Sequence, residues 1–431
     1  MRISAVLDGV QVSLGCTEPG AIALACALAR KAVGGEVERV SVLCDANVFK
    51  NALGVGVPGA DGQRGVAIAA ALGAEAGDPD LRLKVLAAVE PDHLRRANRL
   101  IADGQVDCEV DRGRTGIYIE ATVRTTEGVG RAVIAGTHLG VTEITANDEP
   151  AELPGWVARR RQEKVQGGSV LDGSLHDVLT VAEDLTSSDK EFLLEGVRMN
   201  QAAGRVGIEE SPGLAYGATM ARLIDRGHLA DDASGRATAV ASAAVDARMS
   251  GLPVPIMASG DSGNLGITAT VPVAEVARRL GADDDRLASA LAVSHLVVAY
   301  IKHRVGNLSA LCGVYTAGAP GAAAGMIRLL GGDEAAIGRA IALVVGNVSG
   351  VICDGAKAGC ALKVGTASGL SVRTAYQAMQ GTEVSGSDGI LGDTPERSVY
   401  NLARLGEGMR EADATILDIM MGKMRDAVNE G

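Results

Sequence analysis

Three of the seven cysteines of this chain fall within residues 308–363. Cys312 is followed by Cys353 after 40 residues, and Cys353 by Cys360 after six more. Thiolate sulfur is a soft ligand that selects zinc, Cu(I) or an iron–sulfur cluster. Four thiolates would close a tetrahedral zinc site, whereas three leave a position free. A cluster with one open iron can bind a substrate and act as a Lewis acid.

The backbone must bend if these cysteines are to share one centre. In an unbroken helix, Cys353 and Cys360 would lie about 10 Å apart along the axis, but Gly355 and Gly359 permit a turn between them. We expect Cys353 in a loop after a helix ending near residue 350, and Cys360 at the start of the next helix, where a thiolate is favoured. The spacing fits buried free cysteines equally well, because it contains no tight Cys-x-x-Cys pair.

A further cysteine, Cys16, comes just before a helical pattern at residues 21–33. Thr17 or Glu18 is expected to cap this helix, with Pro19 in its first turn. A thiolate is electrostatically favoured at such a helix N-terminus. The alternative for Cys16 is a turn cysteine whose sulfur is only packed.

Residues 257–270 interrupt the helical second half with glycines and small hydroxyl or amide side chains. Backbone N–H groups of such a loop, and a helix expected after Thr268, can bind a carboxylate, while Asp261 can hold an ammonium group. The segment therefore suits a zwitterionic amino acid. The alternative is an interhelical loop whose polar side chains cap locally.

Two other stretches are candidates for contact with a ligand. Residues 47–59 contain a formal Gly-x-Gly-x-x-Gly, but Pro58 would open badly onto the required helix, so we interpret them as a turn-rich loop near a site. The apolar pattern at residues 285–304 ends beside Lys302, which either binds a carboxylate or extends its amine to solvent as a lysine at a helix end.

These side chains need a scaffold, and the pattern predicts an α+β protein. Valine-rich alternation predicts a strand at 37–44, residues 65–72 are expected to be helical and 83–89 a strand. Residues 106–144 predict an antiparallel sheet with one solvated face. There, His138 is expected to be a satisfied strand histidine, and Cys108 to point inward.

The rest of the chain predicts helices almost to the end. The prediction comprises an N-terminal α+β domain at 1–150, a linker or excursion at 151–174 and a mostly helical domain at 175–431. The Arg159–Arg161 run in the linker is interpreted as a solvated surface.

Composition limits the class of protein. The net charge of −12 argues against nucleic acid or an anionic membrane as a partner. No signal peptide or transmembrane stretch is evident, and an odd number of cysteines fits reduced thiols, so a cytoplasmic protein is expected. With 2% aromatic residues and 57 glycines, the core must consist of Ala, Val, Leu and Ile in closely packed helices.

Five motifs together resemble the L-cysteine desulfidase family, whose second half is similar to the α domain of iron–sulfur L-serine dehydratases. They are Gly-Cys-Thr-Glu-Pro at 15–19, Gly-Val-Gly-Val-Pro at 54–58, Gly-Asp-Ser-Gly-Asn-Leu-Gly-Ile-Thr at 260–268, Leu-Ser-Ala-Leu-Cys-Gly at 308–313 and Cys-Asp-Gly-Ala-Lys-Ala-Gly-Cys-Ala-Leu-Lys at 353–363. The resemblance covers most of the chain, apart from residues 147–174.

The resemblance implies a [4Fe–4S] cluster held by Cys312, Cys353 and Cys360, with one iron open to substrate. It also implies that Cys16 matches the proposed proton acceptor and that L-cysteine is converted to pyruvate, ammonia and sulfide. A small-molecule amino acid is then the expected partner, and a homo-oligomer is possible. The candidates for substrate contact are Thr17, Glu18, Asn51, Asp261, Ser262, Gly263, Asn264, Lys302 and Lys363.

Three alternatives stay open from the sequence. One is the same elimination on L-serine or another β-substituted amino acid, which the pocket would decide. Another is a lyase using pyridoxal phosphate, for which no lysine context stands out. The last is a non-catalytic iron–sulfur sensor, which would have no need of an amino-acid loop.

Overall fold

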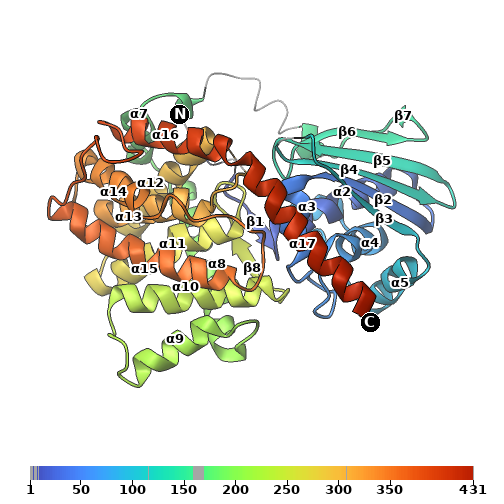
Figure 1. Cartoon of the computed structure of the whole chain (residues 1–431), viewed down its shortest axis with the longest axis horizontal. Helices are drawn as coiled ribbons and strands as arrows, with labels where there is room; N and C mark the ends of the chain where they lie inside the picture. Colours follow the sequence, from blue (N-terminus) through green and yellow to red (C-terminus); the bar gives the residue numbers. More distant parts are fainter. Residues whose placement is uncertain are drawn as a thin grey trace.

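A computed structural model describes residues 3, 7, 9–114, 116–158, 169–306 and 308–430, with 424–430 described by their backbone alone. Figure 1 shows two parts, a sheet with helices against it and a larger group of helices. The α+β class predicted from the sequence is confirmed. No helix of the described ranges is both long and apolar enough to cross a membrane.

The first part is built on a six-stranded sheet with strand order β3-β2-β4-β5-β6-β7. Its strands are β2 (Val37–Asp45), β3 (Val106–Asp111), β4 (Tyr118–Thr125), β5 (Gly128–Ala135), β6 (Val141–Ala146) and β7 (Glu149–Pro150). Neighbouring strands are antiparallel except β2 and β3, which are parallel, so the sheet is mixed where an antiparallel one was expected. Alternating burial along β4 leaves one face solvated, as predicted.

Helices α2 (Thr17–Val33), α4 (Val66–Ala76) and α5 (Pro91–Ala102) belong to this part. α2 packs on the sheet and α4 packs on α2. The contact between α2 and β5 depends on Gly130, where a Cβ would lie 1.9 Å from the Ala29 carbonyl oxygen. Small residues thus allow helix and sheet to approach closely.

Two local predictions in this part are wrong. The first half of the expected loop at 47–59 is helix α3 (Ala46–Leu53), because Asp45 at the end of β2 accepts hydrogen bonds from the backbone N–H groups of Asn47 and Val48. The expected strand at 83–89 is instead the end of a 3₁₀ helix (Pro79–Lys84) followed by turns. The segment 83–89 is rich in apolar residues because these turns are buried in the core.

The second part consists of helices with short connections. They are α7 (Leu175–Thr180), α8 (Ser187–Glu210), α9 (Tyr216–Asp225), α10 (Ala233–Met249), α11 (Gly263–Leu280), α12 (Asp284–Val305), α13 (Ala319–Leu329), α14 (Glu334–Val348), α15 (Cys360–Met379), α16 (Pro395–Gly408) and α17 (Arg410–Glu430), with 3₁₀ turns at Val170–Asp172 and Val181–Glu183 and a π-helical turn at Val314–Gly318. α10 packs against α8, α9, α11 and α15. A Cβ at Gly207 would lie 1.9 Å from the Ala243 carbonyl oxygen, so the predicted close helix packing is confirmed.

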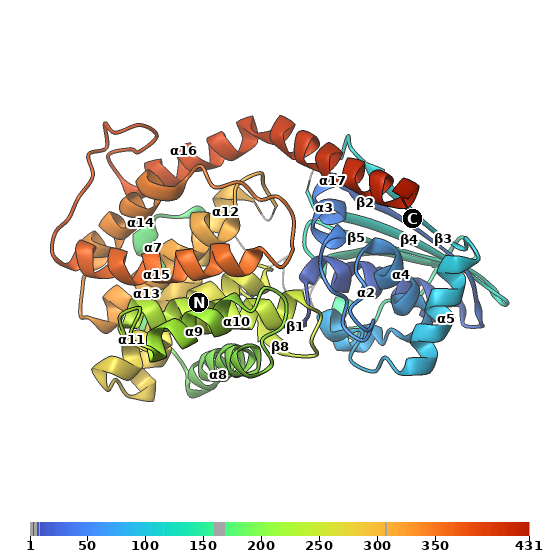
Figure 2. The ribbon, with the colours of Figure 1, turned by 60° about the horizontal axis from the view of Figure 1, so that its bottom comes forward.

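Segments near both ends of the chain connect the two parts. Strand β1 (Val12–Leu14) pairs with β8 (Pro255–Met257) of the helical part. α17 runs from α16 toward the sheet (Figures 1 and 2), and Leu417 on it is buried in the core beside the sheet. The division at 151–174 stays a prediction; Trp156 packs in the same core, and the Arg159–Arg161 run lies outside the described residues.

Candidate active site

The pairing of β1 with β8 joins two of the motifs that were singled out from the sequence. Val12 stands opposite Met257, and the backbone N–H of Ala258 donates to the carbonyl oxygen of Gln11 over 2.8 Å. β1 leads into Cys16 at the start of α2, and β8 leads into the turn before α11. The two helix N-termini are thereby brought together at the junction of the two parts.

Glu18 is the centre of a buried polar cluster at the first of these N-termini. Its carboxylate accepts hydrogen bonds from Cys16 Sγ at 3.0 Å, Thr17 Oγ1 at 2.9 Å and Asn51 Nδ2 at 2.9 Å. His138 Nε2 lies 3.9 Å from the Glu18 carboxylate. His138 follows β5 in a turn, so the interpretation as a satisfied strand histidine is wrong: neither ring nitrogen has a hydrogen-bond partner among the described residues.

The electrostatics of this cluster favour a protonated thiol. Burial raises the pKa of Cys16 well above its usual value, and the Glu18 carboxylate raises it further, although Arg248 acts in the opposite direction. Burial also acts to raise the pKa of Glu18, but His138 and the hydrogen bonds from Cys16 and Thr17 outweigh it, so this pKa is lowered. The thiolate expected from the helix N-terminus is therefore opposed by its surroundings.

Arg248, near the end of α10, connects the two helix N-termini. Its Nε donates to the carbonyl oxygen of Gly15 over 3.0 Å, and its Nη1 donates to Asn264 Oδ1 over 2.8 Å. Only glycine fits at position 263, since a Cβ there would lie 2.5 Å from Arg248 Nε. The side chain is 1% exposed.

The turn before α11 has the tight backbone that its glycines predicted. Ser259 and Ser262 exchange backbone hydrogen bonds of 3.1 and 3.0 Å, and Gly260 and Asp261 both have positive φ. The helix begins at Gly263, so the prediction of a start after Thr268 is wrong. The carboxylate of Asp261 accepts a hydrogen bond from Gln11 Nε2 at 3.2 Å.

Lys302, in the last turn of α12, lies between the two groups of predicted site residues. Its side chain is 8% exposed, so it does not extend into solvent, and its Nζ donates to the carbonyl oxygen of Gly306 over 2.6 Å. Burial lowers the pKa of Lys302 to about 8, while Asp261, Cys353 and Glu18 act to raise it. The ammonium group is thus within electrostatic reach of both the Glu18 cluster and the cysteine loop.

A second short pairing brings Cys312 and Cys353 to adjacent strands. Leu311 pairs with Ile352, and the backbone N–H groups of Cys312 and Cys353 donate to the carbonyl oxygens of Val351 and Ala310 over 2.8 and 2.7 Å. Cys353 lies in a loop after α14, as predicted.

Cys360 is the first residue of α15, which is also as predicted. The pKa of Cys312 is raised to about 12 by its burial and then by Cys353 and Cys360, and Cys353 also raises that of Cys360. Cys353 is therefore close enough to the other two thiols to influence their ionisation.

Lysines surround these thiols. Asp354 Oδ1 accepts from Lys357 Nζ at 2.5 Å and Lys363 Nζ at 2.6 Å, and although burial opposes it, the two lysines hold the pKa of Asp354 at about 2. Lys363 also donates to the carbonyl oxygen of Ile352 over 2.7 Å. Lys363 is therefore a neighbour of the cysteine loop and is engaged within it.

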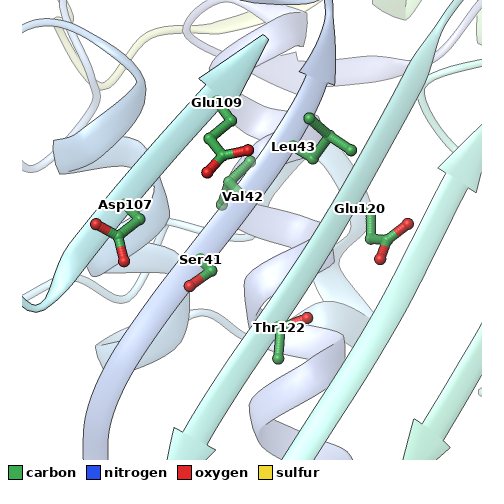
Figure 3. A pocket seen from close by; sticks show the side chains of 7 residues that line it. All are labelled: Ser41, Val42, Leu43, Asp107, Glu109, Glu120 and Thr122. Atoms are coloured by element: carbon green, nitrogen blue, oxygen red, sulfur yellow. The ribbon is translucent and has the colours of Figure 1, made fainter. Parts of the chain in front are cut away.

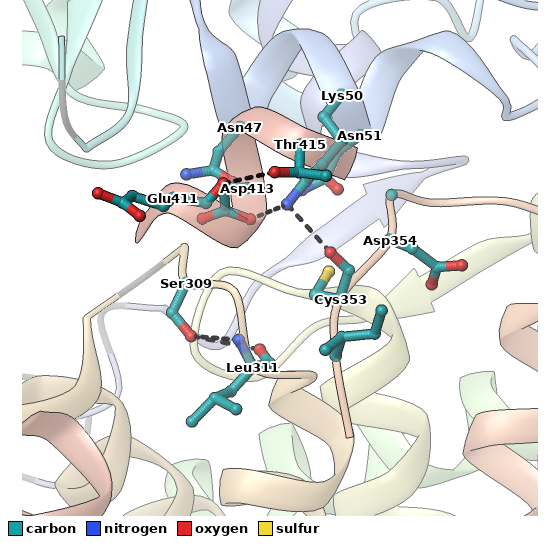
Figure 4. Close-up of polar contacts among 12 residues, drawn as sticks. Asn47, Lys50, Asn51, Ser309, Leu311, Cys353, Asp354, Glu411, Asp413 and Thr415 are labelled. Carbon is teal, nitrogen blue, oxygen red and sulfur yellow. Dashed lines mark hydrogen bonds and ion pairs between the residues drawn. The ribbon is translucent and has the colours of Figure 1, made fainter. Parts of the chain in front are cut away.

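A buried lysine from the other part of the molecule fixes the same loop (Figure 4). Lys50 of α3 donates to the carbonyl oxygen of Cys353 over 3.1 Å and pairs with Asp413 of α17 over 2.6 Å. A Cβ at Gly355 would lie 2.8 Å from the Lys50 carbonyl oxygen, so the loop can approach α3 only with glycine here. Three separate segments of the chain thus fix the position of Cys353.

The Gly54–Pro58 motif lies between the two groups. Pro58 Cγ occupies the space beside Gly15, where a Cβ would lie 2.5 Å from it. At the other end of the motif, a Cβ at Gly54 would lie 3.1 Å from the Ala356 carbonyl oxygen. The expectation that this stretch lies near a site agrees with these contacts on both sides.

The donor set of the three thiols fits a [4Fe–4S] cluster, which thiolates hold. In the described part of the chain, no three His, Cys, Asp or Glu side chains are arranged to hold a single metal ion. A [4Fe–4S] cluster is wider, and each thiolate binds its own iron, so its ligands need not converge on one point. The neighbouring lysines can offset the negative charge of thiolates and sulfides.

One cavity borders the cysteine loop, and another lies on the sheet, away from the predicted site residues. One of about 470 Å³ borders the cysteine loop and is lined by Leu53, Gly54, Ile352, Asp354, Lys357, Ile416, Ile419, Met420 and Lys423. Another, of about 180 Å³, lies on the solvated face of the sheet among carboxylates of β3 and β4 (Figure 3). None of the predicted site residues lines the second cavity.

The structure brings most of the predicted residues into two adjoining groups and adds three that the sequence analysis did not select. Thr17 and Asn51 point at Glu18, while Asp261, Ser262, Gly263 and Asn264 form the turn at α11. The additions are His138, Lys50 and Arg248. Arg248 carried a signal in sequence, because it is a charged residue in the alanine-rich stretch 233–249.

Comparisons with known proteins cover nearly the whole chain. The serine dehydratase alpha chain family matches residues 82–418. A UPF0597 protein of Desulfatibacillum aliphaticivorans is 38% identical over 96% of both chains, and one of Oleidesulfovibrio alaskensis is 40% identical over 95% of both. The UPF0597 protein YhaM of Salmonella gallinarum is 39% identical over 98% of this chain and 97% of its own.

Proposed function

The chain belongs to the serine dehydratase alpha chain family, and from this premise we propose that it is an L-cysteine desulfidase, which eliminates sulfide from L-cysteine. Membership of the family supports a lyase acting on an amino acid. The narrower proposal is that the products are pyruvate, ammonia and sulfide. The same elimination on L-serine is the second candidate, favoured by the description of the family itself.

One observation carries the proposal. The Glu18 cluster and the three-cysteine loop come from distant segments, and both are within electrostatic reach of the buried Lys302. A β-elimination needs a group that takes the α-proton and a group that helps the leaving atom depart, held on either side of one substrate. We propose that the two groups at the junction supply these two functions.

Cys312, Cys353 and Cys360 are the residues that would hold a [4Fe–4S] cluster. When bound, such a cluster with one open iron would supply a Lewis acid for the leaving sulfur or oxygen. The thiols must lose their protons to act as ligands. Lys357 and Lys363 lie beside the loop and favour that loss, since each lowers the pKa of Cys360.

Cys16 is proposed to accept the α-proton, with Glu18 as its partner. The thiol donates to the Glu18 carboxylate in the structure, so transfer of this proton to Glu18 would leave a thiolate. The thiolate would take the proton from Cα, the C–H electron pair would form the Cα–Cβ double bond, and the Cβ–S bond would break with its electron pair leaving on sulfur as hydrosulfide. The resulting aminoacrylate would then hydrolyse to pyruvate and ammonia. We propose that His138, which lies 3.9 Å from the Glu18 carboxylate, receives the proton from Glu18.

The proposed substrate contacts divide between the turn at α11 and the end of α12. Asp261 would hold the ammonium group, while Ser262, Gly263 and Asn264 would present the helix N-terminus to the carboxylate. Lys302 would lie between the reacting groups.

Anaerobic purification followed by a substrate screen tests the proposal. L-cysteine, L-serine and their homologues would be assayed for keto-acid and sulfide release, alongside iron content. We expect brown protein with about four irons that releases pyruvate and sulfide from L-cysteine. A higher kcat/KM for L-serine would transfer the assignment to the second candidate. A fully loaded protein that turns over none of them would contradict a lyase and favour a sensor.

A further inference from the structure

Arg248 is a fully buried cation with no anionic partner among the described residues. Its side chain donates to the Gly15 carbonyl oxygen and the Asn264 amide oxygen, which are both neutral. In the described part of the chain, no carboxylate lies within ion-pairing distance of its guanidinium. A buried charge of this kind is costly unless it is paired, which indicates that an anion belongs beside it.

The nearest carboxylate cluster does not meet this need. Glu18 already accepts hydrogen bonds from Cys16, Thr17 and Asn51 and faces His138. Among the groups that lower its pKa, His138 and the Cys16 hydrogen bond come before Arg248, which is followed by the Thr17 hydrogen bond. Arg248 therefore lies close to the Cys16 and Glu18 groups without being their ion-pair partner.

The guanidinium lies against a helix N-terminus that is also open to an anion. α11 spans 18 residues, and Ser262 at its N-cap forms no side-chain capping hydrogen bond. Gly263 is packed directly against the guanidinium, so the first N–H groups of α11 and the arginine lie next to each other. Both favour a carboxylate, and arginine can bind one through two parallel hydrogen bonds.

Polar atoms without partners mark the same region as one that lacks a ligand. His138 is 2% exposed and Asn51 is 6% exposed, yet both ring nitrogens of His138 and Oδ1 of Asn51 have no hydrogen-bond partner among the described residues. Buried polar groups in proteins are nearly always hydrogen-bonded. Both groups lie beside Glu18, which also accepts the hydrogen bond of Cys16, so a small polar molecule bound here would give them partners.

We propose that Arg248, together with the N-terminus of α11, binds the α-carboxylate of the substrate amino acid and so makes the site select acids over amides and amines. The inference rests on the proposed function, since it assigns the carboxylate of that substrate. Arg248 donates to the carbonyl oxygen of Gly15, the residue before Cys16. A carboxylate bound to Arg248 would therefore bring the α-carbon of the substrate close to Cys16. An amino acid whose carboxylate is replaced by an amide would leave the guanidinium unpaired.

Binding and turnover of L-serine, L-cysteine and the corresponding amides would test this in wild type and in Arg248→Gln. We expect wild type to prefer the acid over the amide by roughly 100-fold, and Arg248→Gln to raise KM for the acid by a similar factor. The ratio of kcat/KM for the acid to kcat/KM for the amide should then fall to near one, with kcat for the acid changed by less than about 10-fold. A merely structural arginine would not alter this acid-to-amide ratio.

Arg236→Gln on the same helix is the matched control, because Arg236 is ion-paired with Asp225 and Asp231 at the surface. It should keep both KM and the acid preference. If Arg248→Gln does not fold, by circular dichroism and iron content, Arg248→Lys retains the charge and should show a smaller loss of preference.

Two outcomes overturn the inference. One is a wild-type protein that binds the amide as tightly as the acid in anaerobic calorimetry, and the other is an Arg248 variant with unaltered KM and preference. Absence of keto-acid release from every amino acid would instead count against the proposed function. In that case the calorimetric comparison of acid and amide still decides the role of Arg248.

Discussion

Cys16 and Cys353 each lie beside a short antiparallel pairing of distant segments, but their surroundings carry opposite charge. Cys16 donates to a buried carboxylate, which together with burial raises its pKa. The loop of Cys353 is held by Lys50 and flanked by two further lysines that share Asp354. Cys16 and Cys360, the latter at the end of the Cys353 loop, were both expected as thiolates because each was placed at a helix start.

The difference is that charged neighbours act in opposite directions on thiols at two helix starts: Glu18 acts to raise the pKa of Cys16, whereas Lys357 and Lys363 act to lower that of Cys360. A thiol with a carboxylate partner holds its proton until that partner takes it, which suits a step of proton transfer. Burial raises the pKa of Cys312 and Cys360 as well, but the lysines act to lower it and so favour the negative charge that metal binding would require. Substitutions in the Cys353 loop should therefore affect iron content, whereas substitutions around Cys16 should affect kcat with iron content retained.

The largest expected effect is from removing a cysteine of the loop. Cys353→Ala should lower both the iron content after anaerobic purification and keto-acid release, the latter by more than about 100-fold, because one of three thiols is gone. Cys108→Ala is the control, since Cys108 lies on β3 in the sheet and should leave both unchanged. A Cys353→Ala protein with full iron and full activity would remove this loop from the proposal.

A smaller loss is expected at the other cysteine group. Glu18→Gln should lower kcat by about 10²–10⁴-fold while iron content is retained, because the amide cannot accept the Cys16 proton. Cys16→Ser should behave in the same way. Glu109→Gln on the solvated face of the sheet is the control. A kcat close to that of wild type in Glu18→Gln would show that the α-proton leaves by another route.

The contribution of the buried Lys50–Asp413 ion pair to the free energy of unfolding can be measured. Lys50→Met should lower the free energy of unfolding by about 3–5 kcal/mol, because Asp413 is left buried and unpaired. Replacing both residues, as Lys50→Met with Asp413→Leu, should restore much of this loss in urea unfolding. Lys31→Met in the exposed pair with Asp80 should change it by no more than about 1 kcal/mol. A double variant no more stable than Lys50→Met would contradict the pairing.

The smallest effect concerns His295, which contacts Ser259 in the turn before α11. Burial lowers its pKa to about 4, so the unfolded chain binds a proton between pH 6.5 and 4 that the folded chain does not. The free energy of unfolding should therefore fall as pH decreases through this range, by at most about 3 kcal/mol from this group.

Urea unfolding of His295→Asn at several pH values would measure that contribution, since this variant should lose part of the decrease. His176→Asn is a control of opposite sign: Glu334 raises the pKa of His176, so its contribution is present below pH 6.5 and is lost as pH rises. Identical pH profiles for wild type and His295→Asn would contradict a neutral buried imidazole.

The sequence predicted well those features that depend on local pattern. The helices of the second part follow from apolar periodicity, and the positions of Cys353 in a loop and Cys360 at a helix start follow from the glycines between them. α3 was missed because the glycines and Pro58 after it dominated the interpretation, although Asp45 is a capping residue. The 83–89 run was misjudged because buried turns and buried strands are both apolar.

The environment of each side chain could not be predicted in the same way. The pairing of β1 with β8 involves three residues in each strand, too few for a recognisable pattern. The carboxylate beside Cys16 was visible in sequence, but its burial and its contact with His138 depend on the folded sheet. Arg248 and Lys50 gain their partners from segments that only the tertiary structure brings close.

The ion pair of Lys50 with Asp413 joins positions 363 residues apart. A ribosome releases α3 long before it makes α17, so a nascent chain carries the Glu18 cluster while the anchor of the Cys353 loop does not yet exist. Loops closed over such distances also form slowly. Under the proposed function, delivery of iron and sulfide should accordingly follow completion of synthesis, and a chain ending before residue 413 should be a poor recipient even though every cysteine is present.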